Sequence, residues 1–333
     1  MKRLFPIIST LMLMLTLALA GCGGGNSGGI PPTSGITLDM VPVSGGLSFP
    51  TDGDTMTMRY GEETADSGYG GKGSDSLHMT VPRAYDIAQT DVTYEQWSTI
   101  YTWATTKATN KYSFAHAGVG GSSGSSDLLQ PVTTVSWSDA IVWCNALTEY
   151  YNANNGKNYA CVYTYNGAII RDSTNNTACS NVTAVSKAGG FRLPTNNEWE
   201  LAARYIGTTA PTVSPLSTAR VEWPSGSGFY WTPGSYASGA TDDYSDSSAT
   251  AEVAVNWPNS CTADVASKRP NQLGLYDMTG NVAQMCFDSY GTHRVMRGWA
   301  YNTFLDVTGL GCMFDCDLTS TYNYAGFRVV RTQ

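Results

Sequence analysis

Three segments of the chain place apolar residues at helical spacing directly after a residue that caps helix N-termini. Thr93, Ser136 and Thr195 are each followed three positions later by Gln, Asp or Glu. In this pattern the two side chains exchange hydrogen bonds with each other's backbone at the start of a helix. The sequence therefore predicts three amphipathic helices that begin after these caps. Their apolar faces consist of Trp97, Ile100, Tyr101 and Ala104; of Ala140, Val142, Trp143, Ala146 and Leu147; and of Trp199, Leu201, Ala202 and Ala203.

The remainder of the chain is predicted to be strand and loop. Residues 162–167 are typical of a hairpin, because Asn166-Gly167 favours the two-residue turns that need positive φ. Residues 207–259 are rich in Gly, Ser, Thr, Pro and Tyr. We expect this stretch to form an ordered loop, because it carries the apolar anchors Trp223, Tyr230, Trp231 and Trp257.

The N-terminus has the pattern of a lipoprotein signal peptide. Lys2 and Arg3 precede an apolar stretch, residues 11–20, that is too short to span a bilayer. It leads into Leu19-Ala20-Gly21-Cys22, which resembles the site cut by lipoprotein signal peptidase. An ordinary cleavage site with an incidental Cys is the alternative, but the Gly- and Ser-rich run that follows is typical of a flexible tether.

The predicted N-terminal organisation is therefore a signal peptide (residues 1–21), a lipidated Cys22 and a tether (residues 22–36). The acyl chains would insert in a membrane while the body of the protein stands away from it. We expect the protein to be anchored by lipid at the outer membrane or the cell surface.

Charge and composition exclude some classes of partner. Removal of the signal peptide takes away Lys2, Arg3 and no acidic residue, so the formal charge changes from −8 to −10. A nucleic acid is therefore excluded as a partner. Roughly 310 residues remain, enough for one large domain or two. Charged residues make up only 14% of the chain, while Tyr, Trp, Asn and Ser are plentiful, which favours strands and ordered loops.

Eight cysteines in an exported protein predict disulfides. Cys161 and Cys179 flank the predicted hairpin and are the expected pair, and Cys286 and Cys312 are further candidates. Only three histidines are present, and they form no zinc-type cluster with the cysteines.

A series of segments further along the chain forms a recognisable set, in a characteristic order. The set resembles the formylglycine-generating-enzyme (sulfatase-modifying factor) family and covers nearly the whole chain after the tether. The resemblance implies an α+β fold, the C-type lectin fold of this subclass, with few helices, short twisted antiparallel strands and long ordered loops. We expect one such domain over residues 37–333. The segments are Pro131-Val132-Thr133-Thr134-Val135-Ser136-Trp137, Gly190-Phe191-Arg192-Leu193-Pro194-Thr195, Leu273-Gly274-Leu275-Tyr276-Asp277-Met278-Thr279-Gly280-Asn281-Val282, Arg294-Val295-Met296-Arg297-Gly298 and Gly326-Phe327-Arg328.

The polar residues of these segments are interpreted as framework. Arg192, Glu198 and Arg328 are expected to tie strands to helices, and Gly280 and Gly298 to satisfy backbone geometry at turns. The resemblance therefore predicts a fold and leaves the activity open.

The copper oxidases of the family use two cysteines with four residues between them. Here three residues separate Cys312 from Cys316, and Asp315 and Asp317 lie where basic groups are expected. Carboxylates nearby disfavour the thiolates that bind copper. We therefore expect no enzymatic activity and no cofactor. A formylglycine-generating oxidase that uses Cys312 and Cys316 is the alternative.

The family's calcium-binding segment is also altered. The oxidases carry Gly-Asn-Val-Trp-Glu-Trp, whereas this chain carries Gly280-Asn281-Val282-Ala283-Gln284-Met285. A hard cation thereby loses its charged oxygen ligand. We expect no bound metal, with a weak site near Asp277 as the alternative.

Residues 301–325 are restricted in composition. They contain no Lys, Glu, Gln or Trp, and only Met313 lies outside the set that codons ending in C or T can specify. Such a bias results when adenines are randomised by an error-prone reverse transcriptase. This resembles the variable lipoproteins of diversity-generating retroelements, such as that of Treponema. A charge-poor strand region in a charge-poor protein could show the same bias by chance.

The resulting hypothesis is a surface lipoprotein that binds a variable protein or glycan ligand, as a monomer, through a variable region at residues 299–325. A structural or adhesive surface protein without diversification is a further alternative. Strand alternation predicts that every second side chain faces solvent, and a slip of one residue would exchange the faces. The expected ligand-binding residues are Trp299 at the rim, Tyr301, Asn302, Thr303, Phe304, Asp306, Phe314, Asp315, Asp317, Ser320, Tyr322 and Tyr324.

Overall fold

The computed structural model describes residues 36–50, 78–185, 187–218, 222–303 and 309–333. It contains the three predicted helices, α1 (Tyr94–Thr106), α2 (Trp137–Asn155) and α4 (Asn196–Arg204), each with its capping box formed. The periodicity did not predict α3 (Asn176–Ser180), α5 (Ser247–Ala251) or the 3-10 helix η1 (Leu216–Thr218). Elements this short span too few turns to show a helical period.

Two four-stranded sheets organise the fold. The first has the order β1 (Met40–Val43), β4 (Tyr85–Ala88), β17 (Val330–Thr332) and β10 (Phe191–Arg192), so strands from both ends of the domain pair with β4. The second has the order β15 (Phe314–Cys316), β14 (His293–Arg297), β13 (Ala283–Tyr290) and β16 (Ala325–Gly326). All neighbours are antiparallel except β13 and β16.

Smaller ribbons complete the architecture. The pairs are β2 (Leu47–Pro50) with β3 (His78–Val81), β5 (Val119–Gly120) with β6 (Val132–Thr133), and β11 (Tyr205–Gly207) with β12 (Tyr230–Trp231). A three-stranded sheet has the order β8 (Ala168–Ile169), β7 (Tyr163–Tyr165) and β9 (Thr183–Ala184). Short antiparallel strands with few helices confirm the α+β fold class.

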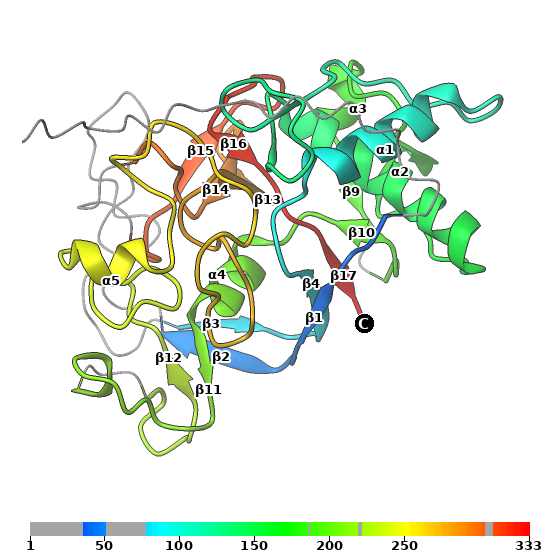
Figure 1. The fold of residues 1–333 in the computed structure, drawn as a ribbon. Coiled ribbons are helices and arrows are strands. Elements are labelled where there is room, and N and C mark those ends of the chain that lie inside the picture. Colours follow the sequence, from blue (N-terminus) through cyan, green and yellow to red (C-terminus); the bar gives the residue numbers. More distant parts are fainter. Residues whose placement is uncertain (1–35, 51–77, 186, 219–221, 304–308) are drawn as a thin grey trace, which may run out of the picture.

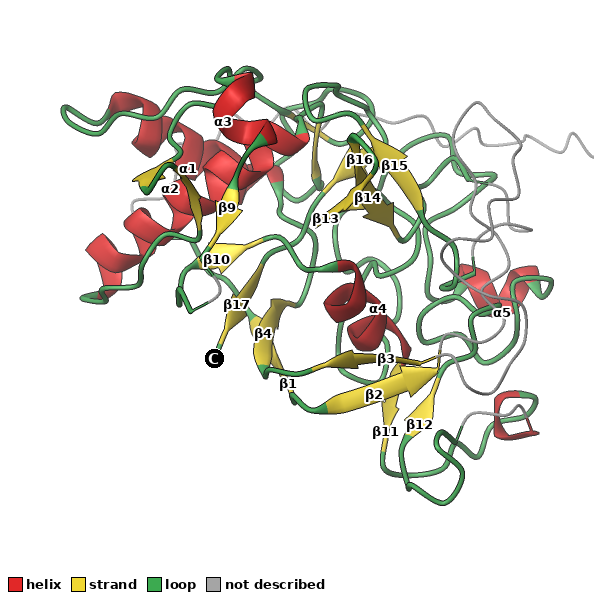
Figure 2. Cartoon of the chain, turned by 180° about the vertical axis from the view of Figure 1, so that it is seen from behind, coloured by secondary structure: helices red, strands yellow, loops and turns green. Residues whose placement is uncertain are grey.

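The core has two main parts, one around α1 and α2 and the other around α4. Figures 1 and 2 show α1 and α2 side by side at one end of the molecule, with α4 between the second sheet and the β2–β3 ribbon. Around α1 and α2, Trp97 stacks on Trp143 at 5.9 Å between ring centroids, and Phe327 meets both rings edge-on. Around α4, Trp199 and Trp231 belong to a second apolar cluster.

The hairpin predicted at residues 162–167 is confirmed. β7 and β8 pair across Asn166 (φ 49°) and Gly167 (φ 77°), the positive values that this turn requires.

The predicted disulfide between Cys161 and Cys179 is wrong, because both residues are buried free thiols. Their sulfur atoms face different backbone carbonyls: Cys161 lies 3.5 Å from the oxygen of Asn145, and Cys179 lies 3.8 Å from that of Ser173. Cys286 is also a buried free thiol, so its pairing in a disulfide is wrong as well.

The polar residues expected to be framework do hold elements together. Arg192 on β10 forms two hydrogen bonds to the Glu198 carboxylate on α4, at 2.6 and 2.7 Å, and further bonds to Thr332 on β17. Gly280 (φ 81°) and Gly298 (φ 87°) take the left-handed conformation that favours glycine. A Cβ on Gly298 would lie 2.9 Å from the Met278 oxygen.

Gln284 on β13 is fully buried, and its side-chain amide joins three elements. The oxygen accepts hydrogen bonds from Trp199 Nε1 at 2.6 Å and from Arg328 Nε at 2.7 Å. The nitrogen donates to the backbone oxygen of Asp277 at 2.6 Å. Both acceptor positions of the amide oxygen, and one N–H of the amide nitrogen, are therefore used inside the protein.

No helix among the described residues is both long and apolar enough to cross a membrane. The predicted signal peptide, the lipidated Cys22 and nearly all of the tether lie outside the described residues.

We predict that Gln284→Met lowers the free energy of unfolding by about 3–5 kcal/mol, since two buried donors and one buried acceptor lose their partner. Urea denaturation followed by tryptophan fluorescence measures the change. Gln272→Met is the matched control on an exposed residue, and should change stability by less than about 0.5 kcal/mol. Equal effects of the two substitutions would contradict a structural role for the Gln284 amide.

Candidate ligand-binding surface

The second sheet positions the segment that was predicted to be variable. On β15, Phe314 and Cys316 are buried and Asp315 between them is partly exposed, as strand alternation requires. β15 pairs with β14 in a register that sets Phe314 opposite Met296 and Asp315 opposite Val295. The strand that carries this segment is thus fixed by its neighbour along its full length.

Three of the residues expected at the exposed face are instead buried. Trp299, Tyr301 and Phe314 are only 6%, 6% and 7% exposed, so their predicted exposure is wrong. The rings of Trp299 and Phe314 stack at 4.8 Å between centroids, which turns both of them into the core. Phe304 and Asp306 lie outside the described residues.

Trp299 has an unusual backbone. Its φ of 59° lies in the left-handed region, which is a rare conformation for a bulky side chain. At this position the family resemblance places a glycine. The indole nitrogen is buried and has no hydrogen-bond partner in the described part of the chain. Strain and an unsatisfied donor of this kind concentrate at functional sites.

The loop after β15 is tied to the framework through its backbone. The oxygens of Leu318, Tyr322 and Tyr324 accept hydrogen bonds from the amides of Ser138, Thr134 and Ala283 at 3.0, 3.1 and 2.8 Å. Because the main chain makes these contacts, they do not depend on which side chains the loop carries. Tyr322 and Tyr324 lie partly exposed with their rings 5.1 Å apart.

We name those predicted ligand-binding residues that are exposed or partly exposed the C-terminal surface. Asn302 and Asp317 are exposed, and the other members are partly exposed. The members are Asn302, Thr303, Asp315, Asp317, Ser320, Tyr322 and Tyr324.

Two neighbours of this surface were not predicted from the sequence. His293 lies between two of its carboxylates, with Nδ1 2.6 Å from Asp315 and Nε2 3.1 Å from Asp317. Trp257 is 47% exposed, and its amide donates to the Thr303 oxygen at 3.1 Å. Both residues are distant in sequence from the loop, and only the strand pairing and the backbone contact bring them there.

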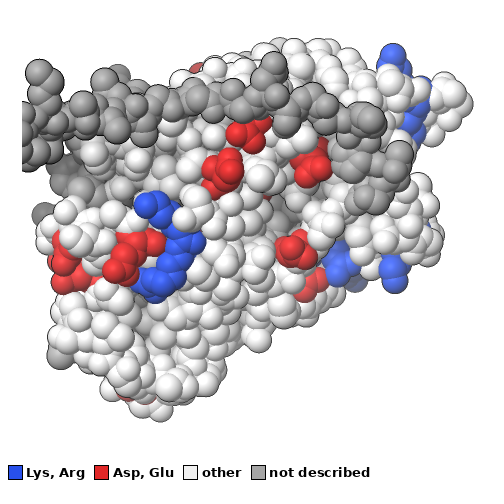
Figure 3. Space-filling model, in the orientation of Figure 1, with Lys and Arg blue, Asp and Glu red and all other residues white. Residues whose placement is uncertain are grey.

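A small hollow adjoins the surface. It has a volume of about 300 Å³ and is lined by Leu318 and Thr319 of the loop, by Ser138 of α2, by residues of α3 such as Asn176, and by Asn181 directly after α3. Its lining contains no charged residue. Figure 3 shows charged side chains in small separate groups on one face of the molecule, which agrees with the low charged fraction of the chain.

The chemistry of the cysteines does not favour a redox site. Burial, together with the carboxylates of Asp315 and Asp317, raises the pKa of the Cys316 thiol to about 12. At neutral pH the thiolate needed for copper binding is therefore scarce. The described residues contain no group of three or more His, Cys, Asp or Glu side chains placed to hold a metal ion. The Gln284 amide oxygen already accepts two hydrogen bonds and does not fit a calcium ligand.

The comparison with known proteins assigns the fold to a family. Residues 38–333 match the sulfatase-modifying factor enzyme 1-like domain. The chain belongs to the FGE-sulfatase family. The family resemblance predicted from the motifs is thereby confirmed, and with it the fold.

Proteins that are similar to this chain carry diverse names. Chaperone protein LppX of Paenibacillus barcinonensis is 27% identical over 225 residues, which cover 61% of this chain and 70% of that protein. The crystal structure of CarF has 26% identity, a TM-score of 0.60, and coverage of 89% of this chain and 99% of its own. Treponema denticola variable protein 1 has 22% identity, a TM-score of 0.56, and coverage of 88% and 95%. At this identity the last match shows a shared fold.

We predict that the thiols of Cys161, Cys179 and Cys316 react very slowly with iodoacetamide at pH 8 in the native protein. Burial raises their pKa values to about 12, about 11 and about 12, which leaves little thiolate. Unfolding in guanidinium without reductant should make all three react, as measured by peptide mass spectrometry. A cross-linked peptide joining Cys161 to Cys179 would instead restore the disulfide prediction.

Proposed function

We propose that the protein is a lipid-anchored surface protein that binds a protein or glycan ligand through its C-terminal surface, and that a retroelement diversifies the side chains of that surface. One observation carries the proposal. The loop over residues 317–324 is held by main-chain hydrogen bonds to α2, β13 and the segment before α2, and these bonds do not use its side chains. A surface that changes its side chains needs a backbone that is held independently of them.

The residues of the surface suit recognition. Tyr322 and Tyr324 supply contact area at a small cost in side-chain entropy, and Asn302 and Ser320 supply adaptable hydrogen bonds. The hollow beside the loop, lined by hydroxyl, amide and apolar groups, offers depth next to these aromatics. The restricted amino-acid composition of residues 301–325 supports diversification of the same segment.

The comparisons support the proposal through the fold. Treponema denticola variable protein 1 shares the architecture over nearly its whole length. The same fold occurs in proteins named CarF and chaperone protein LppX, so the fold alone does not specify the activity. The composition of the C-terminal loop and its backbone hydrogen bonds favour a binding function for this chain.

We infer that the protein is not a formylglycine-generating oxidase. The raised pKa of Cys316 disfavours copper ligation, and the two acidic residues beside it account for part of the rise. We also infer that the protein acts as a monomer and reaches its membrane only through the lipid on Cys22.

We predict that the chromosome carries, near this gene, a second copy of the DNA for residues 299–325 that differs almost only at adenines, beside a reverse transcriptase gene. Codons for Asn302, Asp317 and Tyr322 should differ between the copies, whereas codons for the buried Phe314 and Cys316 should not. Sequencing of the locus in several isolates measures this. Absence of both the copy and the reverse transcriptase gene would remove the diversification part of the proposal.

We predict that the mature protein begins at Cys22 and carries acyl chains there, because the signal segment ends in a lipoprotein-type cleavage site. Mass spectrometry of the N-terminal peptide measures both features. Cys22→Ser should abolish the added mass and release the protein from the membrane fraction. An unmodified N-terminus at another residue would contradict the anchoring.

A further inference from the structure

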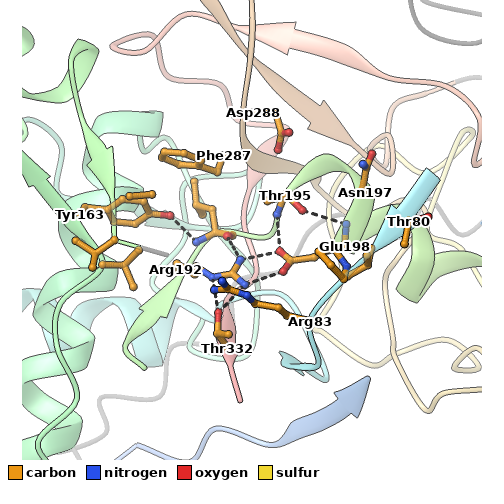
Figure 4. A pocket seen from close by; sticks show the side chains of 16 residues that line it. Thr80, Arg83, Tyr163, Arg192, Thr195, Asn197, Glu198, Phe287, Asp288 and Thr332 are labelled. Atoms are coloured by element: carbon orange, nitrogen blue, oxygen red, sulfur yellow. Dashed lines mark hydrogen bonds and ion pairs between the residues drawn. The ribbon is translucent and has the colours of Figure 1, made fainter. Parts of the chain in front are cut away.

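A second cavity lies apart from the C-terminal surface. It has a volume of about 400 Å³, within the range of small-molecule sites, and none of its lining residues belongs to the C-terminal surface. Its walls come from the end of β3, from β7, β9 and β10, from the start of α4 and from β13. Figure 4 shows the side chains that converge on it.

The body of the cavity is apolar. Val162, Leu193 and Phe287 form much of the wall, and Val185 contributes an apolar side chain that is 40% exposed. The Phe287 ring stacks on Tyr163 at 5.3 Å between centroids, which fixes an aromatic wall. A ligand with a flat or branched apolar body would be removed from water here.

One ion pair at the cavity is already complete. Arg192 and Glu198 form two hydrogen bonds with each other, and the remaining donors of Arg192 bond to Thr332 and to the Leu193 oxygen. Figure 4 shows this group at the centre of the site with its hydrogen bonds directed among the residues themselves. The pair is therefore neutral as a whole and has little capacity for a charged ligand.

Asp288 differs from this pair. One of its carboxylate oxygens accepts a hydrogen bond at 2.6 Å from the amide of Asn196, in the first turn of α4. Among the described residues, no Lys or Arg forms an ion pair with Asp288. The helix amide fixes the position of the carboxylate at the cavity. Arg297 and Arg294 act on this carboxylate electrostatically. The cavity thus combines an apolar wall with one anchored carboxylate that has no direct ion pair among the described residues.

We propose that this cavity binds a small organic cation, in which an ammonium or guanidinium group bonds to Asp288 and an apolar body lies against Phe287, Val162 and Leu193. The polar end of the ligand would turn to Asp288, on β13.

Isothermal titration calorimetry on the full chain in detergent tests the proposal with three probes of similar size. They are 2-phenylethylamine, the neutral 2-phenylethanol and the anionic 3-phenylpropionate. We expect the amine to bind about tenfold more tightly than the alcohol, with no measurable binding of the carboxylate. Saturable binding in which the carboxylate equals or exceeds the amine would overturn the proposal, as would no binding of any probe.

Matched variants locate the site. Asp288→Asn keeps an oxygen for the Asn196 amide but removes the charge, so it should weaken amine binding about tenfold and leave alcohol binding unchanged. Asp317→Asn makes the same charge change on the C-terminal surface and should have no effect. Ala184→Phe fills part of the cavity and should abolish binding of the amine and the alcohol. Thermal denaturation verifies that each variant is folded, and an unaltered affinity in folded Asp288→Asn refutes the role of the carboxylate.

Discussion

The buried amide of Gln284 is the contact on which the rest of the structure depends. It lies on β13, receives the indole of Trp199 from α4 and the guanidinium of Arg328 from the C-terminal segment, and donates to the loop at Asp277. Arg328 extends the connection, because it also donates to the Ala88 oxygen on β4. Both four-stranded sheets and α4 therefore meet at one set of hydrogen bonds. A buried network of this kind is stable only when every member is satisfied.

Strand pairing connects the C-terminal surface to the hydrogen bonds around Gln284. β13 pairs with β14, and β14 pairs with β15, so the position of Asp315 follows from the position of Gln284 through two ladders. The chain returns to β13 at β16, which pairs in parallel through Ala325 and Gly326. Both ends of the loop are thus attached to strands of the same sheet. Its exposed side chains can vary while the entry and exit of the loop remain fixed, which is the property that a binding surface of changing specificity requires.

Helix caps and turns, which depend on neighbouring residues, were predictable from the sequence. Contacts between residues distant in the sequence were not. The caps at Thr93, Ser136 and Thr195 act within one helical turn, and the turn at Asn166-Gly167 acts within four residues, so residue type alone determines them. Burial of Phe314 depends on which face of β15 packs against the core. The alternation of side chains along a strand does not by itself identify that face. The hydrogen bonds of Cys161 and Cys179 to different carbonyls depend on side-chain direction, about which spacing carries no information. His293 and Trp257 reach the C-terminal surface only through tertiary contacts.

The charge balance around Gln284 explains why an amide fits this position better than the carboxylate of the oxidases. Arg328 is fully buried, with Asp91 3.6 Å away, and Asp277 is buried nearby. Burial raises the pKa values of both carboxyls, and the guanidinium of Arg328 offsets part of this rise. One positive group thus already faces two acids. A third carboxylate would add negative charge in a region from which water is excluded, and would need a cation to compensate it. The amide adds no charge, and its N–H bonds to the backbone oxygen of Asp277, so the centre is held together by hydrogen bonds between residues of the chain itself.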